Sequence, residues 1–278
     1  MIRLNPLLAL LLAAPVAWAQ EAKPEAPAAE TAAEPEVARV ATIELTLDGT
    51  EDPHAPMPFG LTPRNYYAML KLVRNAAADK DLHAVILEPK GYAVGLGRLL
   101  EFREALQDLR RAGKKVYFYK EELNAYDLIL ASVADHIAVP ESGWIVVPGV
   151  ATEMLYMKGM LDKLHIRFDV VHIGEFKTAG ESLSRDSMSP AMKEELDPIL
   201  DEMFQSMVRT IAEGRGMTEA AVRGAIDKGI VTAREAKALG LIDAVSYEDE
   251  FRAAIKDDFA GKQLKVATDY RKDKPAID

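Results

Sequence analysis

The chain has 278 residues, 49% hydrophobic and 28% charged, so it can bury a sizeable core in one large domain or two small ones. Its net charge is −10 at neutral pH, which argues against nucleic-acid binding because such binding depends on neutralising many phosphates. It has no cysteine, which excludes disulfides, thiol catalysis and zinc sites built on cysteine.

The N-terminus has the pattern of a secretory signal peptide. A short segment with Arg3 precedes the apolar run 7–16, and Ala17-Trp18-Ala19 has the small-residue pattern of a cleavage site. We predict a signal peptide over residues 1–19 and a periplasmic location, or one at the periplasmic face of the inner membrane. An uncleaved anchor is the alternative, although the run is shorter than the about 20 residues that span a bilayer. Residues 20–38, rich in Ala, Pro and Glu, predict an extended tether.

Strand-like and helix-like segments alternate through the first two thirds of the folded region, which we place at residues 39–278. A helix is predicted to begin with Thr62 as its cap and Pro63 at its first position. The predicted strands are 40–47, 83–87, 115–119, 136–139 and 167–173, and the predicted helices are 62–78, 98–112, 127–133 and 154–164. This alternation predicts an α/β fold with largely parallel strands.

The last third is predicted to be mainly helical. A long helix over 191–215 contains Pro198, and shorter helices over 218–228 and 232–239 begin at the caps Thr218 and Thr232. From Tyr247 we expect a closing helix and a polar tail.

Lys177 is the first candidate for catalysis. A serine hydroxyl becomes a good nucleophile when a neighbouring base removes its proton, and a lysine can do so only in its neutral form. Burial is the usual means of lowering a lysine pKa from about 10.4 by the roughly 3 units that this requires at pH 7. Phe176, Ala179 and the predicted strand 167–173 would supply the apolar surroundings. The alternative is an ordinary surface charge.

The residues around Lys177 form a pattern that resembles the signal peptide peptidase A (SppA) family, whose serine peptidases pair a serine with a lysine. The family pattern K-[ST]-A-x-E-x-x-x-R-x-x-M-S-P fits the run from Lys177 to Pro190. Within this run we expect Ser189, before Pro190, to cap a helix, and Glu181 and Arg185, at helical spacing, to form an ion pair. Further similar segments follow the family's order along the chain: Ala131–Ile137, Ile230–Thr232 and Ala236–Asp243.

The resemblance implies a crotonase-like fold of repeated β-β-α units with a helical C-terminal part. It also implies a Ser/Lys dyad with Lys177 as general base, peptide substrates, and neither a cofactor nor a metal. The family's nucleophile motif S-G-G falls here on Ala125, Tyr126 and Asp127. Ala125 has no hydroxyl, so the nucleophile is lost, and the chain resembles the lysine-bearing half of the family's long form.

Three glycines form a second candidate feature. Gly91, Gly95 and Gly97 lie between a predicted strand and a helix N-terminus, where backbone N–H groups can form an oxyanion hole. We favour a structural turn, because the spacing is loose. Ser132 is read as an ordinary residue of its helix rather than a substitute nucleophile.

Three functions remain open from the sequence. The leading hypothesis is a protease subunit that needs a serine from another domain or chain. The second is an inactive secreted module of the same fold. An acyl-CoA enzyme is the third, and it conflicts with the secretory signal. Met154, Met157 and Met160 share helical spacing, which predicts core packing or a face for a homo-oligomer.

Overall fold

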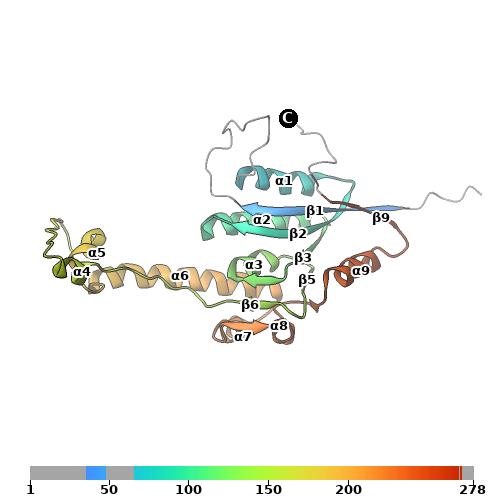
Figure 1. The fold of residues 1–278 in the computed structure, drawn as a ribbon. Helices are drawn as coiled ribbons and strands as arrows, with labels where there is room; N and C mark the ends of the chain where they lie inside the picture. Colours follow the sequence, from blue (N-terminus) through green and yellow to red (C-terminus); the bar gives the residue numbers. More distant parts are fainter. Residues whose placement is uncertain (1–35, 48–65, 269, 271–278) are drawn as a thin grey trace, which may run out of the picture. The chain divides into compact units, whose positions relative to one another are not determined.

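The centre of the fold is a six-stranded sheet in the order β8-β5-β3-β2-β1-β9, in which every neighbouring pair is parallel (Figure 1). It is seen in a computed structural model that describes residues 36–47, 66–268 and 270. The predicted signal peptide, the tether up to residue 35 and the predicted helix start at Thr62 lie outside these residues. The strands of the sheet are β1 (Val37–Leu47), β2 (Leu82–Tyr92), β3 (Lys115–Tyr119), β5 (His136–Val139), β8 (Ala244–Val245) and β9 (Gln263–Ala267).

Helices cover both faces of this sheet. Helices α1 (Tyr66–Ala78), α2 (Leu96–Arg111) and α3 (Ala125–Ala131) bury apolar side chains in one large core with alternate residues of β1. The opposite face packs against α9 (Glu248–Asp258) through Phe251 and Ile255, which meet Tyr117 and Val40. Because both faces are covered, β3, with the sequence KVYFY, buries the three consecutive residues Val116, Tyr117 and Phe118 rather than alternate ones.

A second, three-stranded sheet shows the repeat that the resemblance predicts. Its order is β4-β6-β7, with β4 (Glu122–Asn124) parallel to β6 (Trp144–Val146) and β7 (Ile230–Thr232) antiparallel to β6. Since β3 pairs with β5 in the first sheet while β4 pairs with β6 in the second, successive β-β units stack on one another. The predicted α/β class with repeated β-β-α units is confirmed.

The C-terminal third is helical, as predicted. Helix α6 (Pro190–Arg215) continues through Pro198, and it is followed by α7 (Glu219–Ile226) and α8 (Ala233–Leu239). Ser189, Thr218 and Thr232 each accept a hydrogen bond from a backbone N–H in the first turn of the helix that follows, so these caps are confirmed.

Several predictions were wrong in detail. Residues 167–173 are an exposed segment without strand pairing, and the helix expected over 154–164 is reduced to α4 (Lys158–Lys163). The short strands β4 and β6 were missed because three residues are too few to show a period. The expected polar tail contains β9, which extends the sheet beside β1, and β1 itself already begins at Val37. Within the described residues, no helix is long and apolar enough to cross a membrane.

Candidate active site

Lys177 lies at the end of the exposed 167–173 segment, immediately before the short 3-10 helix η2 (Thr178–Gly180). Its backbone N–H donates to the carbonyl of Gly174 at 3.3 Å. The side chain is exposed, Phe176 is 48% exposed, and Ala179 is exposed as well. The apolar enclosure expected around this lysine is therefore not supplied by these neighbours, because the segment before it does not join a sheet.

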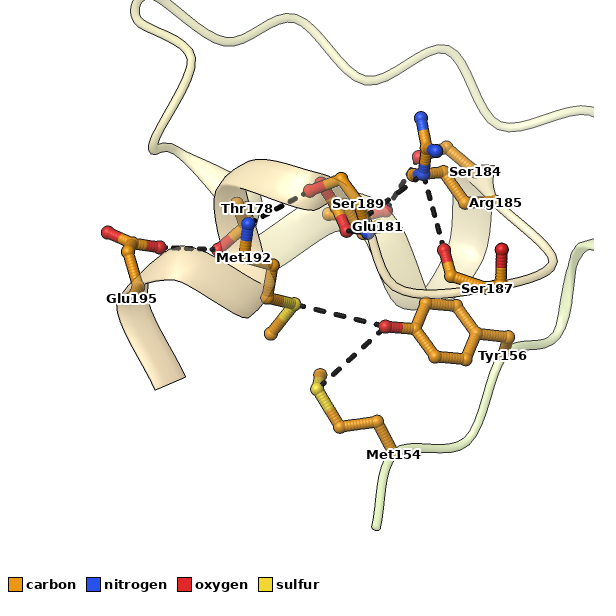
Figure 2. Close-up of polar contacts among 11 residues, drawn as sticks. Met154, Tyr156, Thr178, Glu181, Ser184, Arg185, Ser187, Ser189, Met192 and Glu195 are labelled. Carbon is orange, nitrogen blue, oxygen red and sulfur yellow. Dashed lines mark hydrogen bonds and ion pairs between the residues drawn. The ribbon is translucent and has the colours of Figure 1, made fainter. Parts of the chain in front are cut away.

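The motif that follows Lys177 builds the start of α6 (Figure 2). A carboxylate oxygen of Glu181, in α5 (Glu181–Ser184), accepts a hydrogen bond from the backbone N–H of Ser189 at 3.0 Å. The Ser189 hydroxyl oxygen in turn accepts from the N–H of Met192 at 3.0 Å. Hydrogen bonding to Ser189, with Arg185 4.0 Å away, holds the pKa of Glu181 below its usual range. The predicted Glu181–Arg185 ion pair is present, and Ser189 is a helix cap as expected.

The segment Lys177–Arg185, here called the lysine segment, contacts the N-terminal end of α6. The Thr178 hydroxyl donates to a carboxylate oxygen of Glu195 at 3.3 Å (Figure 2). The Tyr156 hydroxyl lies 3.9 Å from the sulfur atoms of both Met154 and Met192. Met154 thus packs within the chain, and Met157, also half-buried, donates its backbone N–H to the carbonyl of Ser182. Of the three methionines predicted to share a face, only Met160 is exposed.

The position at which the resemblance expects the nucleophile, Ala125, lies at the N-terminus of α3. Ala125 is the first residue of this helix, and the preceding Asn124 forms a capping box with Asp127. Asp127 is fully buried, and its carboxylate accepts three hydrogen bonds, from the Tyr92 hydroxyl at 2.8 Å, from Lys120 Nζ at 2.7 Å and from the Asn124 N–H at 2.9 Å. Burial, followed by the charge of Asp127 and the hydrogen bond to it, raises the pKa of Tyr92 well above its ordinary value.

This network was not predicted from the sequence. The spacing of Asn124 and Asp127 is a capping-box signal that could have been recognised, because both residue types at that distance precede an apolar run. Nothing in the sequence links Tyr92 or Lys120 to them. Tyr126 and Asp127 stand where the resemblance expects two glycines, and Ala125 has no hydroxyl.

The glycine turn before α2 is open. Gly95 is the N-terminal cap residue of α2 in an extended conformation, and a Cβ added at Gly91, Gly95 or Gly97 would meet no atom within 4 Å. None of the three has a positive φ, so the backbone conformation itself does not require glycine. Gly91 lies in β2 and Gly97 lies in the first turn of α2, so only Gly95 belongs to the connection between the strand and the helix. The oxyanion role stays a prediction.

Ser132 cannot serve as a substitute nucleophile. It is completely buried, its hydroxyl donates to the carbonyl of Ile129 at 2.7 Å, and it accepts from Arg103 Nε at 3.0 Å. Arg103 also reaches the carbonyl of Thr210, so this cluster joins α2, α3 and α6. Its role is structural.

The lysine segment and α3 lie at different ends of α6 (Figure 1). The lysine segment is hydrogen-bonded to Ser189 and Glu195 at the N-terminal end of α6, whereas the buried residues that face the core, from Met207 to Ala212, are at the other end. From Met192 to Met207 the helix advances about 22 Å at 1.5 Å per residue. The chain therefore does not bring Lys177 close to the nucleophile position in its own α3.

A polar cleft of about 370 Å³ lies where β2 and β3 end. It is lined by Glu88, Pro89, Lys90, Tyr119, Lys120, Glu121, Glu122 and Glu248. No serine, threonine or histidine is in its lining, so it offers no nucleophile. Among the described residues, no group of three histidine or carboxylate side chains is placed to hold a metal ion.

Comparison with known proteins identifies the family. The model of Peptidase family S49 matches residues 108–261, which is more than half of the chain. The chain belongs to peptidase family S49. The resemblance to signal peptide peptidase A enzymes predicted from the sequence is thereby confirmed, and the match includes both Ala125 and Lys177.

Two of the curated relatives are much longer than this S49 chain. It is 27% identical over 220 residues to "Protease 4" of Salmonella typhi, covering 76% of this chain and 35% of the relative. It is 26% identical over 199 residues to "Serine protease SPPA, chloroplastic" of Arabidopsis thaliana, covering 71% and 29%. The S49 chain thus spans about a third of the length of these relatives.

Solved structures are more distant. A mutant of the "1510-N membrane-bound stomatin-specific protease" matches with a TM-score of 0.49 and 13% identity, covering 87% of this S49 chain and 99% of the other. An enoyl-CoA hydratase/isomerase family protein from Silicibacter pomeroyi matches with a TM-score of 0.41 and 15% identity, covering 80% and 77%.

Proposed function

We propose that this chain supplies Lys177 as the general base of a Ser/Lys dyad in a signal-peptide-peptidase-like serine protease, and that the serine comes from another domain or chain. The observation that carries the proposal is the placement of Lys177. It lies at the head of a segment that Glu181 and Ser189 fix to α6, in a chain of family S49. The absence of a hydroxyl at Ala125 requires the nucleophile to come from elsewhere.

The proposed chemistry follows from the two groups. Lys177 Nζ, in its neutral form, takes the proton from the hydroxyl of a serine in the partner as that oxygen bonds to the peptide carbonyl carbon. The same proton passes from Nζ to the leaving amine as the C–N bond breaks, which leaves an acyl-enzyme for water to hydrolyse. In this chain Lys177 is open to solvent, so a partner that covers it would supply both the serine and the desolvation.

The proposed substrates are released signal peptides or other unfolded peptides. They would be met in the periplasm or at the periplasmic face of the inner membrane, as the predicted signal peptide implies. No cofactor or metal takes part in the proposed reaction.

The test is reconstitution of the mature chain, from Gln20, with a serine-bearing S49 subunit whose own lysine has been replaced by alanine. We expect peptide hydrolysis that is lost with Lys177→Ala and also with Lys177→Arg, because a guanidinium keeps the charge but does not release its proton. Lys193→Ala removes another exposed lysine near the start of α6 and is the matched control. Hydrolysis that survives Lys177→Ala contradicts the proposal.

The second candidate is a catalytically inactive module of the same fold. It is favoured by the site around Ala125, where Asp127, Lys120 and Tyr92 occupy the turn that a substrate would approach in the family's active domains. A mature chain that binds peptide without turnover, both alone and with a serine-bearing subunit, would support this reading over the first.

A further inference from the structure

The polar cleft lies just beyond Leu87 and Phe118, the last residues that pair β2 with β3. The crevice beyond the carboxyl ends of parallel strands is where open α/β sheets commonly bind ligands. Its volume of about 370 Å³ is in the range of small-molecule sites. Lys177 is not in its lining, so the proposed dyad leaves this cleft without a role.

Both lysines of the lining have a carboxylate partner within the chain. Lys120 Nζ donates to the buried carboxylate of Asp127 at 2.7 Å. Lys90 Nζ lies 3.6 Å from a carboxylate oxygen of Glu88. An anionic ligand would have to displace one of these carboxylates, so the cleft does not favour anions.

Two glutamates of the lining have no such partner. Glu88 and Glu248 both contact the guanidinium of Arg252, at 3.3 and 2.7 Å. Glu121 and Glu122 are exposed, and their side chains make no ion pair or hydrogen bond to any residue in the described part of the chain. Carboxylates that line a recess raise the local concentration of cations, because the walls of low dielectric constant focus their field.

Tyr119 lies in the negative potential of the cleft. Its pKa is raised by burial, and then by the charges of Glu248, Glu121 and Asp249. Carboxylates from two segments of the chain therefore act on the same hydroxyl. The Tyr119 ring packs on Phe251 with 5.2 Å between the ring centroids, which fixes this wall of the cleft.

An exposed tryptophan lies beside one of the unpaired glutamates. Trp144 of β6 pairs in register with Glu122 of β4, so the two side chains lie on the same face of the three-stranded sheet. Trp144 is 44% exposed, although tryptophan is usually well buried. A carboxylate next to an open indole ring can hold an ammonium or a guanidinium by charge and by cation–π attraction.

We propose that the polar cleft binds the ammonium or guanidinium group of a lysine or arginine side chain in a peptide, with Glu121 and Glu122 as the counter-charges and Trp144 at the rim. Only the choice of a peptide as the source of the cation rests on the proposed function. The binding itself uses neither Lys177 nor a serine from another chain. Glu122 lies three residues before Ala125, so a peptide at the start of α3 can extend a side chain into the cleft.

The test uses the mature chain, from Gln20, in which Trp144 is the one remaining tryptophan and thus a fluorescent reporter at the rim of the cleft. Its fluorescence is titrated with a short peptide that has blocked termini, no aromatic residue and a single lysine, and with the same peptide carrying uncharged norleucine instead. We expect the lysine peptide to bind about three- to tenfold more tightly. This preference should shrink as the salt concentration rises.

The variants place the preference in the cleft. Glu121→Gln combined with Glu122→Gln should bind the two peptides alike, and circular dichroism checks that this double variant is folded. Glu104→Gln combined with Asp201→Asn is the matched control, because it removes the same charge at exposed positions on α2 and α6. The control should keep the preference for lysine.

Several outcomes overturn the proposal. They are equal affinity of the wild-type chain for the two peptides, a lysine preference that survives the double variant, and a preference that the control variant loses as well. Binding of spermidine without binding of either peptide would assign the cleft to free polyamines instead. Lys177→Ala is expected to keep the preference, so a failed reconstitution of activity leaves this proposal standing.

Discussion

Lys120 Nζ and Asp127 Oδ2 lie 2.7 Å apart, and Asp127 is in the first turn of α3, two residues after Ala125. The Asp127 side chain is fully buried, whereas 27% of the Lys120 side chain remains exposed at the edge of the polar cleft. Ala125 is the position at which the resemblance expects a serine, so this pair shapes the first two predictions.

Restoring the hydroxyl alone is not expected to restore activity. In the Ala125→Ser variant, the new serine stands two residues before Asp127 of the Lys120–Asp127 pair. Lys177 precedes the segment that is hydrogen-bonded to the opposite, N-terminal end of α6. A serine without a base in contact is a poor nucleophile. Ester hydrolysis by the purified variant should therefore equal that of the Ala125→Ser, Lys177→Ala double variant. A rate that depends on Lys177 would show that the two positions meet, within one chain or between copies.

Removing the carboxylate should destabilise the fold. Asp127→Ala leaves Lys120, the Tyr92 hydroxyl and the N–H of Asn124 without their acceptor, so we expect unfolding to become easier by about 2–4 kcal/mol. Urea unfolding followed by circular dichroism measures this change. Asp135→Ala, which removes a partly exposed carboxylate, is the comparison. An Asp127→Ala chain as stable as the wild type would mean that the network is energetically neutral.

Removing the N-terminal cap of α6 should affect the start of this helix rather than the whole fold. Ser189→Ala removes the acceptor for the Met192 N–H and is expected to cost about 1 kcal/mol. Hydrogen exchange should become faster in residues 177–195, whose contacts lead to the helix start, and remain unchanged in the six-stranded sheet. Ser187→Ala, at an exposed position two residues earlier, is the control. Equal exchange in both variants would argue against the cap as the support of the lysine segment.

The hydrogen bond between Glu181 and the Ser189 N–H should depend on pH. The pKa of Glu181 is lowered in the folded chain by Ser189, so its contribution is present above the unfolded value of about 4.3 and is lost as the pH falls through the lower folded value. The amide resonance of Ser189 should accordingly titrate with a midpoint below about 4.3, and this titration should vanish in Glu181→Gln. A midpoint at or above the ordinary glutamate value would contradict the structure.

Sequence patterns were sufficient where neighbouring residues determine the local conformation. The caps Ser189, Thr218 and Thr232 were recognised because a single side chain satisfies a backbone N–H two or three residues away. The strands β3 and β5 were predicted with their observed bounds, since each contains three consecutive apolar or aromatic residues that are buried between the covered faces of the sheet.

Sequence patterns failed where the conformation depends on a segment far away in the chain. The run 167–173 has the composition of a strand, but a strand exists only when a neighbour supplies hydrogen bonds, and none lies beside it in the described structure. Conversely, residues 263–267 were read as a polar tail, yet they pair with β1. The same reasoning explains Asp127, whose partners Tyr92 and Lys120 come from other segments.

The sequence by itself determined the family and the α/β class, because these follow from residue identity and order. The loss of the nucleophile at Ala125 stays a prediction. The tertiary structure decided what surrounds those residues. It left the side chain of Lys177 exposed to solvent, and it buried Asp127 in contact with Lys120 and Tyr92. It also left large apolar side chains between Leu155 and Phe176 exposed. Burial and pairing arise between segments far apart in the chain, so only the folded arrangement fixes them.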